Sequence, residues 1–109
     1  MDKATEEKLM QLQILEQNLQ ASLTQKQNFQ TQSLEVDNAL KEIEKNKKEV
    51  YKIAGNIMVL AEKTELKKEL EEKKETLDLR LKSIEKREKE LKEKTSKLQK
   101  EVMEKIQKK

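Results

Sequence analysis

The feature that most constrains the fold of this chain is a short apolar segment at its midpoint. Residues 50–61, VYKIAGNIMVLA, are the only stretch of the 109 residues that departs from a charged helical pattern, and they contain Gly55, the only glycine. On either side, more than forty residues continue without a proline, the residue that most strongly breaks a helix. The sequence therefore predicts two long helical arms joined by one fold-back.

The composition leaves too little apolar material for an ordinary globular core. Charged residues make up 43% of the chain, hydrophobic residues 33% and aromatic residues 2%. Disordered chains share this composition, but the helical spacing of the apolar residues and the lack of proline favour coiled-coil helices. The predicted fold class is mainly α, a long antiparallel two-helix coiled coil with a central β-hairpin. We expect a single unit with a first helix over 1–48, a hairpin over 49–64 and a second helix over 65–109.

Several classes of function are disfavoured by residues that the chain lacks. It has no cysteine and no histidine, which removes the commonest zinc ligands and the commonest general base. No glycine-rich loop could cradle a phosphate. We therefore expect no enzyme, no metal and no cofactor. The N-terminus lacks an apolar signal core and the apolar segment is too short to span a membrane, so we expect a soluble, cytoplasmic protein.

The first arm carries a mostly apolar seam at heptad spacing. Its two seam positions hold Leu15, Ser22, Phe29, Val36 and Ile43, and Leu12, Leu19, Lys26, Ser33 and Leu40. In the second arm, one position is aliphatic throughout: Leu70, Leu77, Ile84, Leu91 and Leu98. Its companion position stays open between two largely polar frames, Lys73, Arg80, Arg87 and Lys94, or Lys74, Leu81, Glu88, Thr95 and Val102. In either frame the polar layers hold the two helices together only loosely.

The position of the turn determines which residues face each other across the two arms. A fold-back centred on Gly55 and Asn56 pairs residues whose numbers add to about 113, such as Val36 with Leu77. Heptad matching alone would also permit sums of 106 or 120. Those registers would centre the fold away from the turn, at residue 53 or 60, so we expect the sum near 113.

The middle segment has the composition of a β-hairpin. Gly55 and Asn56 supply the positive φ of a tight turn between two runs of β-forming residues. Thr64, followed by Glu65, is predicted to cap the second helix. An isolated two-stranded hairpin is marginal in water and exposes unpaired edges, so it predicts an oligomer; the alternative is that the segment packs on its own arms. The predicted assembly residues are Val50, Tyr51, Ile53, Ile57, Met58, Val59 and Leu60.

The free ends of the arms carry more apolar residues than one seam requires. Some of them must face outward, where flexible methionines would adapt to many shapes; the alternative is a frayed helix end without a ligand. The candidate binding residues are Leu9, Met10, Leu12, Ile14, Val102, Met103 and Ile106. The last sixteen residues hold six lysines against two glutamates. This charge suits the helix dipole, or contact with nucleic acid, an anionic membrane surface or an acidic protein. No aromatic residue follows Tyr51, which disfavours nucleic-acid binding.

Two blocks of the sequence resemble the β-class subunits of prefoldin. They are EVYKIAGNIMVLAEKTELKKELEEKKETLDLRLKSIEKREKEL, over Glu49–Leu91, and the glutamine-rich QLQILEQNLQASLTQKQNF that precedes it in the first arm. The most specific part is VYKIAGNIMV, with its strand, Gly-Asn turn and strand. A single hairpin and a length near 110 residues are typical of the β class, whereas α-class subunits carry two hairpins.

The resemblance implies a hexamer of two α-class and four β-class subunits, whose hairpins join into a β-barrel platform. Such assemblies hold non-native client proteins between the arm tips without ATP and deliver them to a group II chaperonin. By this resemblance, residues 50–60 would form the platform and the apolar tip residues would contact clients. Lys105, Lys108 and Lys109 would dock on an acidic chaperonin surface. The rival hypothesis is a structural coiled coil that tethers one defined partner, and a nucleic-acid binder is a distant third.

Overall fold

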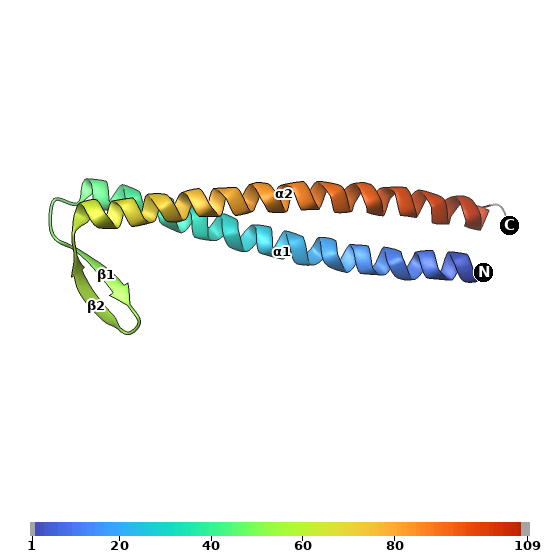
Figure 1. The fold of residues 1–109 in the computed structure, drawn as a ribbon, viewed down its shortest axis with the longest axis horizontal. Coiled ribbons are helices and arrows are strands. Elements are labelled where there is room, and N and C mark those ends of the chain that lie inside the picture. Colours follow the sequence, from blue (N-terminus) through green and yellow to red (C-terminus); the bar gives the residue numbers. More distant parts are fainter. Residues whose placement is uncertain (1, 108–109) are drawn as a thin grey trace. The chain divides into compact units, whose positions relative to one another are not determined.

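The structure, a computed structural model, describes residues 2–107 of the chain. Its elements follow in the order α1 (Lys3–Lys45), β1 (Val50–Ala54), β2 (Ile57–Ala61) and α2 (Lys63–Gln107). The two strands form one antiparallel two-stranded sheet (Figure 1). The predicted class, two long helices with a central hairpin, is confirmed.

The chain divides into two compact units, and both helices contribute to each. The terminal unit contains the residues up to Gln27 and those from Lys82 onward. In it, the start of α1 and the end of α2 lie at the same end of the helix pair (Figure 1). The central unit is Asn28–Leu81 and contains the whole hairpin.

The helix ends differ in detail from the prediction. Asp2 caps α1, since its Oδ1 accepts a hydrogen bond from the backbone N–H of Thr5 at 2.7 Å. At the other end α1 stops at Lys45, not at residue 48. Thr64 is not the cap of α2, and that prediction was wrong: the helix already begins at Lys63, and the N–H of Leu66 bonds to the carbonyl oxygen of Glu62 at 2.9 Å.

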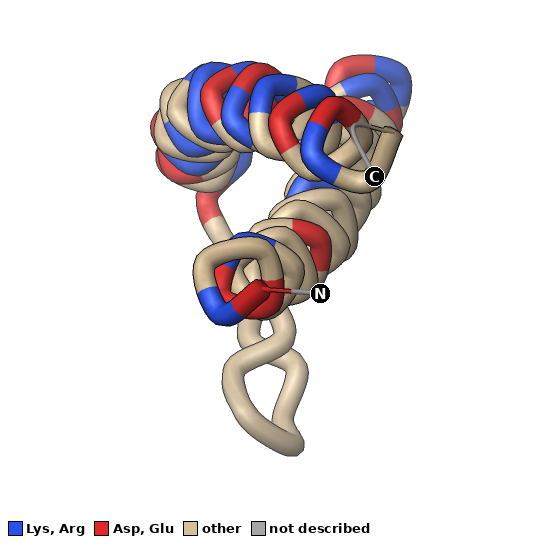
Figure 2. Tube along the Cα trace, turned by 90° about the vertical axis from the view of Figure 1, so that its right-hand side faces the viewer, with Lys and Arg blue, Asp and Glu red and all other residues tan. Residues whose placement is uncertain are grey.

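The burial pattern of α2 decides which companion frame faces α1. Lys73, Arg80, Arg87 and Lys94 are all exposed, whereas the members of the other frame, Lys74, Leu81, Glu88, Thr95 and Val102, are buried or half-buried. The second frame, with alternating steps of three and four residues, is therefore the seam of α2. Figure 2 shows how densely acidic and basic residues alternate along this helix.

In the terminal unit, charged and polar side chains share the seam with aliphatic ones. The buried hydrophobic residues there are Ile84, Leu91 and Val102. Lys26 of α1 meets Glu88 of α2 across the seam, with 3.0 Å between Nζ and Oε2. Since these two numbers add to 114, this layer lies one residue from the predicted register of 113. Lys8 and Glu101 form a second ion pair between the helices at 3.4 Å.

In the central unit the buried residues are all hydrophobic. They are Val36, Ile43, Val50 and Leu77. Ion pairs flank this core: Lys74 donates to Asp37, and Lys67 lies 3.2 Å from Glu44. The guanidinium of Arg80 also lies over the ring of Phe29, 5.8 Å from its centre, within the range of a cation–π contact.

Candidate assembly and client-binding surfaces

The hairpin is built around a two-residue turn. Ala54 pairs with Ile57, which leaves Gly55 and Asn56 as the two central residues. Gly55 has a φ of 64°, and no non-glycine residue in the described chain has a positive φ. A positive φ at the first central residue alone is the pattern of a type II′ turn, whose twist matches that of the strands. The predicted turn is confirmed, although only Gly55 supplies the positive φ.

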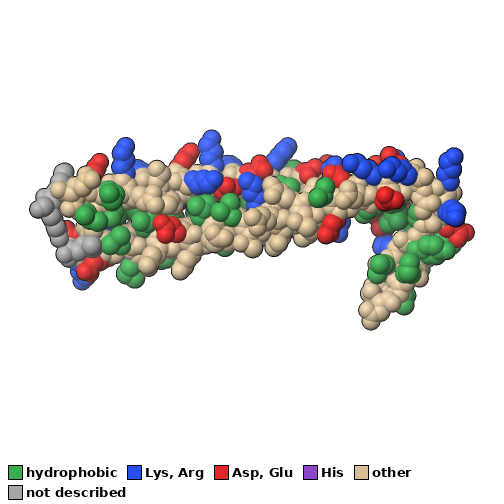
Figure 3. Space-filling model, turned by 180° about the vertical axis from the view of Figure 1, so that it is seen from behind, with side chains coloured by type: hydrophobic (Ala, Val, Ile, Leu, Met, Phe, Trp, Pro, Cys, Tyr) green, Lys and Arg blue, Asp and Glu red, His purple; other side chains and the backbone are tan. Residues whose placement is uncertain are grey.

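Pairing in the hairpin sorts its side chains onto two faces. Tyr51 lies opposite Leu60 and Ile53 opposite Met58, so these four share one face. The other face holds Lys52, Ala54, Ile57 and Val59. Ile53 is 73% exposed and Met58 70%, and the hairpin carries hydrophobic side chains at its surface in Figure 3. Among residues 2–107, Val50 is the only hairpin residue that is buried, and the other hydrophobic side chains on both faces are exposed or half-buried.

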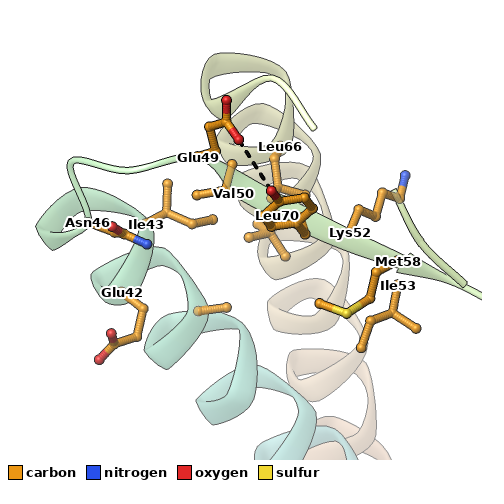
Figure 4. Close-up of a pocket in the computed structure, with 12 residues that line it drawn as sticks. Glu42, Ile43, Asn46, Glu49, Val50, Lys52, Ile53, Met58, Leu66 and Leu70 are labelled. Atoms are coloured by element: carbon orange, nitrogen blue, oxygen red, sulfur yellow. Dashed lines mark hydrogen bonds between the residues drawn. The ribbon is translucent and has the colours of Figure 1, made fainter. Parts of the chain in front are cut away.

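Val50 has a different role from the other predicted assembly residues. It is only 9% exposed and lines a cavity of about 540 Å³ at the junction between the hairpin and the helices. Figure 4 shows Val50 beside Ile43, Leu66 and Leu70 in this cavity, with Ile53 and Met58 on its hairpin side. Val50 therefore packs the hairpin onto its own helices, and the six remaining residues are the exposed ones.

Polar contacts at the surface also hold the junction between the hairpin and the helices. Lys52 of β1 pairs with Glu69 of α2 at 2.9 Å. Lys63, the first residue of α2, donates to the backbone carbonyl of Asn46, just after α1. The Asn46 side chain in turn accepts from the N–H of Lys48 at 2.9 Å, a local turn typical of asparagine. These contacts tie both ends of the hairpin to the helices.

The tip residues fall into two groups in the terminal unit. Four are exposed, Met10 by 64%, Ile14 by 54%, Met103 by 54% and Ile106 by 45%. Leu9 and Leu12 are half-buried. The exposed four are side chains that the helix pair leaves uncovered, and hydrophobic side chains gather at this end in Figure 3.

Val102 does not belong to an exposed binding surface. It is 4% exposed, because it continues the α2 seam one heptad beyond Thr95. The companion frame that contains Val102 predicts from the sequence alone that this residue is buried in the seam. Of the lysines expected at the tip, Lys105 is half-buried in α2, and Lys108 and Lys109 lie outside the described residues.

Glu88 is a buried charge that its sequence pattern did not single out. Its side chain bonds to Lys92 of the same helix at 2.9 Å and to Lys26 of α1 at 3.0 Å. The bonds from Lys92 and Lys26 lower the pKa of this carboxyl below its ordinary value of 4.5. In the central unit, the bond to Asp37 raises the pKa of Lys74 above 10.5.

Two exposed leucines were also not anticipated. Leu34 of α1 and Leu79 of α2 are exposed by 61% and 64% in the central unit. Both fall outside the heptad seam, so the seam pattern alone could not single them out.

Within residues 2–107, no helix is long and apolar enough to cross a membrane, and no group of three or more carboxylates is placed to hold a metal ion.

Comparison with known proteins identifies relatives for nearly the whole chain. The family model described as "Prefoldin subunit" matches residues 6–109. Among solved structures, the prefoldin beta subunit from Thermococcus strain KS-1 is 36% identical, covers 94% of this chain and 92% of its own, and superposes with a TM-score of 0.86. The prefoldin beta2 subunit from the same strain is 24% identical over 82% of this chain and 97% of its own, with a TM-score of 0.74, and shares the fold. A comparison with curated proteins by sequence gave no match.

Proposed function

Because the chain belongs to the prefoldin family, a family of non-enzymatic chaperones, we propose that it is an ATP-independent holdase subunit that captures non-native proteins with its arm tips. In this role, it assembles through its hairpin with other prefoldin subunits, two of the α class and four copies of this chain. The assembly passes its clients to a group II chaperonin in the cytoplasm.

The observation that carries the holdase role is the exposure of Met10, Ile14, Met103 and Ile106 in one unit. Exposed large apolar side chains favour contact with the apolar segments that a non-native protein presents. Methionine and isoleucine make contacts without directional hydrogen bonds, and methionine is flexible enough to fit many surfaces. A surface of this kind suits many clients better than one.

The hairpin supports the assembly half of the proposal. Six of its apolar residues are exposed on a two-stranded sheet whose edges have no partner strand within residues 2–107. Such edges pair readily with other strands, and packing against another sheet would cover exposed side chains on a face of the hairpin. We assign the assembly surface to Tyr51, Ile53, Ile57, Met58, Val59 and Leu60.

Serine substitution of the tip tests the holdase role. The variant M10S/I14S/M103S/I106S removes most of the exposed apolar area, so protection of a denatured client from aggregation, followed by light scattering, should fall at least about ten-fold. Substituting the exposed glutamines Gln11, Gln13, Gln17 and Gln20 by serine is the matched control and should change little. Both variants should form complexes of unchanged mass.

Unchanged protection in the tip variant would favour the rival role, a tether for one defined partner.

The chaperonin step has its own test at the lysine-rich end of α2. Charge reversal of Lys105, Lys108 and Lys109 should weaken chaperonin binding, and the loss should be larger at low salt because the contact is electrostatic. No loss at any salt concentration would remove these lysines from the docking surface.

A further inference from the structure

The cavity at the junction between the hairpin and the helices lies between two apolar walls of the same chain. Four apolar residues of the two helices form the helix wall: Ala39, Ile43, Leu66 and Leu70. Three residues from one face of the hairpin form the opposite wall: Tyr51, Ile53 and Met58. Figure 4 shows Ile53 and Met58 apart from the helix residues, so the two walls do not touch there.

The hairpin is attached to the helices only at its base. Val50 is buried there, and Lys52 pairs with Glu69. Both side chains of this ion pair are about half exposed, and an exposed pair of this kind contributes little to stability. Within residues 2–107, no hydrogen bond or ion pair joins residues 53–60 to either helix. The turn end of the hairpin can therefore swing about Val50 at little cost in polar contacts.

Water between the two walls gains little from the side chains that surround it. Water in an apolar space has few polar groups to bond, and removing both walls from water is favourable. Ile53 and Met58 have the most to gain, since they are the two most exposed large hydrophobic residues of the hairpin. The small side chain of Ala39 leaves room for a strand to approach α1 closely.

The polar residues that line the cavity do not oppose its closing. They are Glu42, Asn46, Glu49 and Lys52, and all four are exposed. A buried charge would be costly, but these side chains can remain in water while the apolar walls meet. Closing therefore buries hydrophobic side chains without stranding a charge.

We propose that the hairpin of the unassembled chain swings about Val50 and closes over this cavity, so that Ile53 and Met58 pack against Ala39 and Leu70. The structure holds the open arrangement, and the closed one hides one apolar face of the hairpin. A further consequence rests on the proposed function: the hidden face is one that assembly needs, so subunits must open their hairpins before they join.

The distance between two spin labels tests the closing directly. The chain has no cysteine, so N56C/E35C places one label on the turn and one on α1, a helical turn before Ala39 on the same face. Asn56 does not have a positive φ and Glu35 is exposed, so both sites accept a cysteine. At a concentration where native mass spectrometry shows single chains, we expect a short distance that is absent in the complex with α-class subunits.

In the complex, the labelled chain is diluted with natural chain so that only labels within one subunit are measured. Identical distances in the single chain and in the complex would overturn the closing. This measurement leaves every residue of both walls unchanged, so it does not depend on a variant of the cavity.

A lysine at position 39 should keep the hairpin open. In A39K the ammonium cannot be buried beneath the hairpin, so the short distance should disappear from the single chain. A21K makes the same change at an exposed alanine of the same helix and should leave the short distance in place. Circular dichroism checks that both variants keep their helices. Closing over the helix wall is overturned if A39K changes the distance no more than A21K does.

The rate of assembly tests the consequence for function. If the closed hairpin cannot assemble, the apparent rate is reduced by the fraction of chains that are closed. A39K should then assemble with α-class subunits at least about three-fold faster than the natural chain, and A21K at the natural rate. An open A39K hairpin that assembles no faster would overturn the link to assembly. A natural chain that closes but never assembles would instead overturn the proposed function.

Discussion

Glu88 shows how a single side chain can make the pairing of the two helices in the terminal unit depend on pH. It is 7% exposed, and burial alone would raise the pKa of a carboxyl. The hydrogen bonds from Lys92 and Lys26 outweigh the effect of burial and lower the pKa of Glu88. The folded state therefore favours the ionised carboxylate more than the unfolded chain does.

This balance predicts a loss of stability in acid. Because the folded pKa of Glu88 lies below 4.5, its contribution is fully present above that pH and disappears as the pH falls through the folded value. In urea unfolding, E88Q should therefore have a lower midpoint than the natural chain at about pH 7, and the difference should shrink towards about pH 3. The exposed Glu90 provides a control, E90Q, which should show little difference at either pH. An equal deficit of E88Q at both pH values would contradict the argument.

At the scale of elements, the hairpin depends on one strand residue for its attachment to the helices. Val50 is packed in the cavity with Ile43, Leu66 and Leu70, while Val59 on β2 is 44% exposed. Both valines have the same intrinsic preference for strands, so they differ chiefly in what they contact. That makes them a matched pair.

Replacing each valine by alanine should separate attachment from assembly. V50A removes buried methyl groups and should lower the free energy of unfolding of the single chain by about 1–3 kcal/mol. V59A should cost the single chain much less, because its side chain is already exposed. Chemical denaturation followed by circular dichroism measures both, and equal losses would show that Val50 does not anchor the hairpin.

Much of this architecture could be predicted from the sequence, because heptad spacing and a central Gly-Asn turn are local signals. The helices and the hairpin followed from them. The register of 113 agrees with the Lys26–Glu88 layer to within one residue. The ion pairs Lys67–Glu44 and Lys8–Glu101 join residues whose numbers add to 111 and 109. The companion frame of α2 could not be chosen, since Arg80 and Glu88 are about equally unsuited to a seam and only cross-helix partners decide between them. Thr64 was misplaced because a capping residue is defined by where the helix begins. Val102 was misassigned because its exposure depends on that same frame.

At the scale of the whole molecule, the exposed large apolar side chains of residues 2–107 other than Leu34 and Leu79 form two groups in different units. One group lies on the hairpin in the central unit, and the other lies at the helix ends in the terminal unit. If both groups served the same purpose, such as non-specific association, changing either one would affect oligomer formation. The proposed function instead gives them separate tasks, assembly and client capture.

Complex formation with an α-class subunit distinguishes these possibilities. I53S/M58S should reduce assembly at least about ten-fold, because these two side chains share one face of the hairpin and would be central to a buried sheet. M10S/M103S removes two exposed methionines of the terminal unit and should give a complex of unchanged mass with two α-class subunits and four copies of this chain. Native mass spectrometry measures both, and client protection measured in parallel should fall for the tip variant although its complex is intact. If I53S/M58S assembled normally, the apolar hairpin face would have to serve another partner, and the proposed division of tasks between the two units would be wrong.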